Sequence, residues 1–175
     1  ILEELEHARN RGARIYAEVV GFGASANAHS WSEPHPEGRG IALAVTKALA
    51  DAGVAPEAVD LIGAFGSGIP AQDLSEAKGL HKALGDRAKN VPVLVTKGSI
   101  GNNGAGAGAI DVALATLCMV NNTVPAALNV KNVDPACGLS IPTGKPVDAR
   151  INLAVTVAYA LGGGHNAALV IKRWE

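Results

Sequence analysis

Hydrophobic residues recur along the chain at two spacings, and segments with the two spacings alternate. Helical spacing predicts helices over four stretches, which are 2–12, 40–52, 73–84 and 104–120. Runs rich in β-branched residues predict strands over six stretches, which are 15–20, 59–65, 91–96, 124–129, 151–161 and 166–174. Polar loops are expected at 23–40 and 130–150. Alternation that ends in a strand pair predicts an α/β fold with a layered mixed sheet.

The predicted helix 104–120 differs from the others because it is apolar nearly all round. Only Asp111, Thr116 and the weakly polar Cys118 interrupt it. A surface helix has one polar face, so this helix is expected to be buried, with sheet or helix on both sides. Its length and central Asp make it a poor membrane span.

Composition places the chain among globular domains. Apolar residues make up 48% and charged residues 18%, and we expect one domain over 1–175. Aromatic residues are 3% and the formal net charge is −1, which argues against nucleic-acid and membrane-surface binding. Cys118 and Cys137 show no metal-ligand spacing, so neither a metal nor a disulfide is expected. The N-terminus has no signal-peptide pattern, which predicts a cytoplasmic protein.

A glycine cluster at 98–108 lies between a predicted strand and helix 104–120. Gly104, Gly106 and Ala109 satisfy G-x-G-x-x-A, a pattern that places a pyrophosphate at a helix N-terminus. Small residues continue down the helix to Ala115, which favours close helix packing instead. Both interpretations, a nucleotide site and a packing surface, follow from the pattern.

Three turns follow predicted strands, at 65–70, 96–102 and 161–166. Such turns lie at one edge of an open α/β sheet, where ligands bind. Their sequences, together with the segments around them, resemble the carboxy-terminal half of β-ketoacyl-acyl-carrier-protein synthases, the thiolase-fold condensing enzymes. Six blocks stand in the order and spacing of that family: LEELEHARNRGARIYAEVVGFG, PHPEGRG, DLIGAFGSGIPAQDLSEAKGLHKALGD, VPVLVTKGSIGNNGAGAGAIDVALATL, TVPAALNVKNVDPACGL and ALGGGHNAALVIKR.

The resemblance implies that this chain is one half of a thiolase-like fold. In that fold, two half-domains pack their sheets around a layer of two buried helices. It also implies a Cys nucleophile from the other half and two histidines from this one. Phe65 and Asn102 stand at the two histidine positions. Phe65 can donate no hydrogen bond, whereas the Asn102 amide still can.

Other family positions carry over with changes. Two family positions carry hydroxyl groups that would contact pantetheine. Ser67, beside Gly66, keeps a hydroxyl at the first position, whereas Ile69 stands at the second and has none. Leu161 matches the phenylalanine that gates the acyl pocket. Lys97 and Glu76 match a structural ion pair behind the active site.

The resemblance therefore implies a degenerate condensing-enzyme half in fatty-acid or polyketide synthesis. We expect a non-condensing scaffold and acyl-tunnel partner of a ketosynthase, similar to a chain-length factor. The alternatives are an acyltransferase or malonyl decarboxylase that uses Asn102 as donor with a Cys from a missing N-terminal half, and a nucleotide-binding domain. The expected partners are that half or a ketosynthase, an acyl carrier protein, and further copies in a homo- or hetero-oligomer. No cofactor is expected.

Overall fold

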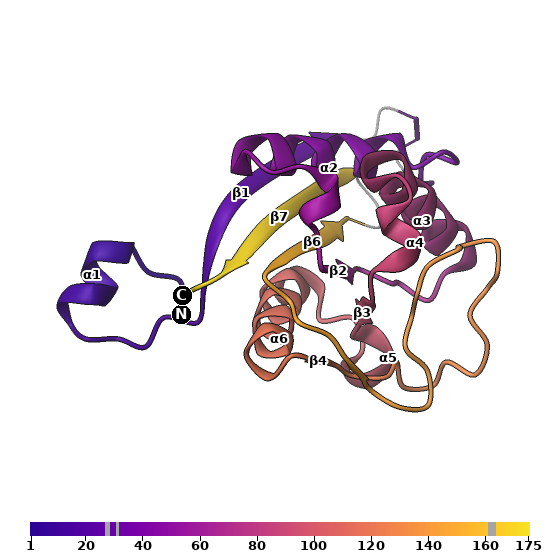
Figure 1. Cartoon of the computed structure of the whole chain (residues 1–175). Coiled ribbons are helices and arrows are strands. Elements are labelled where there is room, and N and C mark those ends of the chain that lie inside the picture. Colours follow the sequence, from indigo (N-terminus) through magenta and orange to yellow (C-terminus); the bar gives the residue numbers. More distant parts are fainter. Residues whose placement is uncertain (27–28, 31, 161–163) are drawn as a thin grey trace.

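The computed structural model describes residues 1–26, 29–30, 32–160 and 164–175. A five-stranded mixed sheet forms its centre (Figure 1). The strands, in their order across the sheet, are β1 (Ala17–Ala26), β7 (His165–Arg173), β6 (Leu153–Tyr159), β2 (Leu61–Ala64) and β3 (Val93–Val95). β1, β7 and β6 are antiparallel neighbours, whereas β6, β2 and β3 run parallel. The predicted α/β fold with a mixed sheet is confirmed.

Helices cover both faces of this sheet. One face carries α2 (Arg39–Ala52), α3 (Pro70–Leu84) and the short α4 (Arg87–Asn90), and the other carries α6 (Ala107–Asn121) (Figure 1). The smaller elements are α1 (Leu5–Asn10), the 3-10 turns Pro56–Ala58 and Gly104–Gly106, α5 (Lys97–Ile100), and a two-stranded ribbon of β4 (Thr123–Val124) and β5 (Val147–Asp148). α1 stands away from the sheet, where Arg9 lies over the Trp174 ring.

The sheet separates two hydrophobic clusters. The cluster under α2 and α3 is built mainly from Val, Ala and Leu, including Val45, Leu80 and Val155. The cluster under α6 includes Leu61 and Met119, both fully buried. Alternate side chains of the inner strands thus enter opposite cores, as expected for strands covered on both faces.

Among the described residues, α6 is covered on one side only. Asp111, Ala115 and Met119 are buried against the sheet, whereas the side chain of Leu117 is 52% exposed. Gly104–Asn121 is long and apolar enough to cross a membrane by length and composition alone, and 28% of it is buried. The expected burial on both sides therefore requires a layer that the described part of the chain does not supply.

Several predicted boundaries shift in the structure. β1 continues to Ala26, into the predicted loop 23–40, and α3 begins at Pro70 because proline suits the first turn of a helix. The strand predicted at 124–129 is wrong, since pairing stops at Val124. Pro125 has no N–H for a ladder and Asn129 adopts a left-handed φ of 64°.

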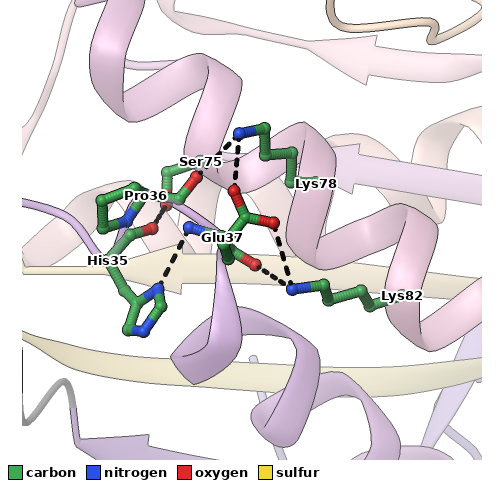
Figure 2. Close-up of polar contacts among 6 residues, drawn as sticks. All are labelled: His35, Pro36, Glu37, Ser75, Lys78 and Lys82. Atoms are coloured by element: carbon green, nitrogen blue, oxygen red, sulfur yellow. Dashed lines mark hydrogen bonds and ion pairs between the residues drawn. The ribbon is translucent and has the colours of Figure 1, made fainter.

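The turn that precedes α2 is held by α3 (Figure 2). Ser75 Oγ donates to the His35 carbonyl at 2.7 Å, and the Lys78 and Lys82 ammonium groups bond Glu37. Gly38 closes the turn with a φ of 59°, and a Cβ there would lie 2.1 Å from the Ser75 carbonyl oxygen. Only glycine fits this approach, so the start of α2 is fixed against α3.

Candidate functional site

An open groove of about 830 Å³ lies where α6 begins beside the ends of β6 and β7. Alanine and glycine line most of it, which leaves the groove wide. Its larger lining side chains are Phe65, Asn102, Tyr159, His165 and Asn166. The structure thus brings together the two positions, Phe65 and Asn102, that the sequence marked as matching the family histidines.

Phe65 follows β2, and its ring contacts Tyr159 and Lys97. Its side chain is buried, and its ring centroid lies 4.5 Å from that of Tyr159. The Lys97 ammonium stands 4.4 Å from the centroid, within the range of a cation–π contact. The position is therefore filled by a packed aromatic ring without a hydrogen-bond donor.

Glu76 shapes the turn that begins at Phe65. Its two carboxylate oxygens accept the N–H groups of Phe65 at 2.7 Å and Gly66 at 3.0 Å. Complete burial raises the pKa of Glu76 to about 7, although these two hydrogen bonds favour the ionised form. Asp73 also raises this pKa, and Lys97 opposes it weakly. The carboxyl group therefore sets the direction in which the turn leaves β2.

The predicted ion pair between Lys97 and Glu76 is wrong in its acidic partner. The Lys97 ammonium pairs with Asp111 on α6, and the two side chains are 6% and 2% exposed. Thr96 Oγ1 donates to the other Asp111 oxygen at 2.6 Å. Both carboxylate oxygens of Glu76 accept backbone N–H groups, and Asp111 neutralises the buried Lys97 ammonium instead.

The other predicted acyl-facing residues are placed differently. The Ser67 hydroxyl donates to Asp73 at 2.9 Å and accepts the Ile69 N–H, so it stabilises the turn beside the groove. The Asn102 side-chain oxygen, Oδ1, accepts the Gly104 N–H at 3.0 Å, which leaves the side-chain NH₂ group as a donor. Leu161 lies outside the described residues.

The glycine cluster packs tightly at one end only. A Cβ at Gly98 would lie 2.4 Å from the Leu128 carbonyl oxygen, whereas a Cβ at Gly104 or Gly106 would meet nothing within 4 Å. Gly104 and Gly108 line the groove. Most of the cluster therefore forms an open wall in this chain.

Neither cysteine is placed for nucleophilic chemistry. Burial raises the pKa of Cys118 to about 11, and burial with nearby acidic groups raises the pKa of Cys137. Thiols of this kind stay protonated at neutral pH and are weak nucleophiles. Among the described residues, no group of three or more His, Cys, Asp or Glu side chains could hold a metal.

Two contributors to the site were missed in the sequence. Tyr159 packs against Phe65, and burial next to the Glu76 carboxylate raises the pKa of its phenol. Its place two residues before the sequence LGGGHN is the signal that could have identified it. For Asp111 the signal was its position as the single acid in an apolar helix, because a buried charge requires a partner.

Comparisons with known proteins show which proteins the chain is similar to. Residues 16–131 match the family described as beta-ketoacyl synthase, C-terminal domain. The chain is 38% identical over 173 residues to the 3-oxoacyl-[acyl-carrier-protein] synthase 2 of Coxiella burnetii, with 99% of this chain and 42% of that protein covered. It is 37% identical to the protein of the same description from Synechocystis sp., with 100% of this chain and 42% of that protein covered.

Solved structures give the same picture. A type II polyketide synthase acyl carrier protein in complex with its ketosynthase bound to the hexaketide superposes with a TM-score of 0.93 at 28% identity, covering 99% of this chain and 42% of that one. The ishigamide ketosynthase/chain length factor superposes with a TM-score of 0.91 at 32% identity, covering 99% of this chain and 42% of that one. The chain thus spans about two fifths of the length of the proteins it matches, and the thiolase-like assignment of the fold is confirmed.

Proposed function

Because the chain belongs to the β-ketoacyl synthase C-terminal domain family, we propose that it is a non-condensing half that builds the wall of an acyl tunnel for a ketosynthase. The observation that carries this proposal is Phe65, a buried ring at the end of β2 where the family resemblance expects a histidine. The pathway class is fatty-acid or polyketide synthesis. The proposed location is the cytoplasm.

The chemistry of condensation supports this assignment. Decarboxylation of a malonyl thioester builds negative charge on the thioester oxygen, and a donor aimed at such an oxygen contributes about 10²–10³ in rate. Phe65 supplies no donor, and the nearby Lys97 ammonium is neutralised by Asp111. What remains around the groove is a wide, mostly apolar wall, suited to an acyl chain.

Asn102 supports a second candidate function. It lines the groove together with Phe65, and its NH₂ group remains a donor because its oxygen is used by Gly104. With a Cys nucleophile from an N-terminal half, this donor would serve acyl transfer or malonyl decarboxylation. The two candidates differ in whether Asn102 takes part in chemistry.

The Asn102→Ala substitution separates them. For a scaffold, we expect carbon dioxide release from malonyl carrier protein by the full-length protein with its ketosynthase partner to stay within about twofold of wild type. A donor role predicts a loss of about 10²–10³. Thermal unfolding of both proteins controls for damage to the turn, and a selective loss of release without loss of stability would contradict the scaffold.

The proposed partners follow from the surfaces left open. The outer face of α6 exposes Leu117 and is proposed to pack against the N-terminal half or a ketosynthase. An acyl carrier protein would deliver the acyl group to the groove. In the similar type II polyketide synthase complex, an acyl carrier protein is bound to its ketosynthase. The assembly is accordingly a homo- or hetero-oligomer.

The tunnel-wall role predicts a change of product length. Ala105 lies on the groove wall and is exposed, so Ala105→Phe narrows the groove without entering a core. Mass spectrometry of the acyl products should show a shift toward shorter chains at similar total turnover. Ala50→Phe, at an exposed position on α2, is the matched control, and equal effects of both substitutions would contradict the role.

A further inference from the structure

β1 forms one edge of the sheet. Nine of its ten residues pair with β7, and among the described residues no strand covers its other side. A long edge strand offers free N–H and C=O groups to which another strand can add. β1 also carries the exposed hydrophobic side chains of Val19 and Phe22. By these features alone, it would invite pairing between copies.

Two side chains of α2 bind the free backbone groups of this edge. Asp51 Oδ2 accepts the Phe22 N–H at 2.9 Å, and Lys47 Nζ donates to the Ala24 carbonyl at 3.1 Å. In an antiparallel strand, the N–H and C=O groups of one residue point to one side of the strand, and those of the next residue point to the other side. Phe22 and Ala24 are two residues apart, so their backbone groups face the same edge. Both bonds involve a charged group, which makes them stronger than neutral ones.

Glycines in β1 explain how α2 reaches around the strand. A Cβ at Gly21 would lie 2.3 Å from the Ala48 carbonyl oxygen, and a Cβ at Gly23 would lie 2.0 Å from that of Ala44. The helix therefore rests directly on the strand backbone. Lys47 and Asp51 are four residues apart, so they project from the same side of α2 over successive turns.

The opposite edge of the sheet is covered by a different device. The Val93 N–H of β3 donates to the Ser140 carbonyl at 2.9 Å, and Pro92 forms an isolated parallel bridge with Ser140. Pro92 has no N–H to offer a further strand. Both edges are thus engaged by groups of the chain itself.

We propose that Lys47 and Asp51 close the β1 edge against strand addition by a second copy of this chain. Copies and partners then meet this half through the faces of its layers, such as the open side of α6, rather than by extending its sheet. This inference does not depend on the catalytic state of the groove.

The test uses the full-length protein with the double substitution Lys47→Ala/Asp51→Ala. Both positions are exposed and the net charge is unchanged. We expect at least tenfold faster hydrogen exchange of the Phe22 amide, together with concentration-dependent self-association and an intermolecular β-sheet signal in infrared spectra. The matched control is Asp86→Ala/Lys89→Ala, which removes an exposed ion pair away from the β1 edge and should leave both readouts at wild-type values.

Each result decides the proposal. Faster exchange with association in the edge variant alone supports it. Unchanged exchange, faster exchange without association, or equal association in the control overturns it. Asp51→Asn keeps an acceptor for the Phe22 N–H and should remain like wild type. If the double variant does not fold, Lys47→Ala and Asp51→Ala carry the same readouts singly, with smaller increases expected.

Discussion

Replacing Lys97 with Met is expected to lower the free energy of unfolding by about 3–5 kcal/mol, because a buried carboxylate loses its cation. Asp111 is 2% exposed and pairs with Lys97. After the substitution, the Thr96 hydroxyl is its remaining side-chain hydrogen-bond donor among the described residues. Urea unfolding at neutral pH measures the loss.

A second substitution tests the cause. In Lys97→Met/Asp111→Leu both charges are gone, and an apolar replacement of a buried pair is often close to neutral. We therefore expect the double variant to recover most of the lost stability. Lys89→Met removes the cation of an exposed pair with Asp86 and should change stability by less than about 1 kcal/mol. A double variant as unstable as Lys97→Met would contradict an electrostatic origin.

The sequence predicted the layers of the fold because periodicity reports burial directly. The helix 104–120 is a clear example, since its lack of a polar face indicated a layer on each side. The structure supplies the sheet on one side and leaves Leu117 exposed on the other. Periodicity cannot tell whether the second layer belongs to the same chain.

Position along the chain decides which candidate residues lie together, while their roles toward an acyl chain stay a prediction. Phe65 and Asn102 follow neighbouring parallel strands, so sheet topology brings them to the same groove. The partner of Lys97 depended on side-chain direction instead. Glu76 and Asp111 both lie close to Lys97, and the backbone N–H groups of the Phe65 turn, which a sequence pattern does not describe, engage Glu76.

The contacts of Phe65 show what an aromatic ring contributes at the end of β2. A histidine at the end of β2 would stand next to the Lys97 ammonium, whereas Phe65 places a ring face there. The ring also packs against Tyr159, which joins the ends of β2 and β6 beside the groove. Phe65 therefore contributes packing to the groove wall at the position where the resemblance expects a histidine.

Stability should also depend on pH through Glu76, because burial raises the pKa of this carboxyl group from its ordinary value of 4.5 to about 7. A raised pKa means that the folded state binds the proton more tightly than the unfolded state. The contribution of Glu76 to the free energy of unfolding is therefore fully present below pH 4.5. It declines as the pH rises from 4.5 to 7, and it is lost above pH 7. A difference of this size corresponds to about 3 kcal/mol.

Glu76→Gln isolates this contribution from the histidines that titrate in the same range. Glutamine resembles the protonated carboxyl group and offers one carbonyl oxygen to the Phe65 and Gly66 N–H groups. The stability of the Glu76→Gln variant should therefore not follow the Glu76 titration. The stability of wild type minus that of Glu76→Gln, measured by urea unfolding, should fall by about 2–3 kcal/mol between pH 5 and pH 8. Asp86→Asn, at a side chain that is 91% exposed, should give a flat difference over the same range. Parallel curves for wild type and Glu76→Gln would mean that Glu76 stays ionised throughout, held by its two backbone hydrogen bonds against the cost of burial.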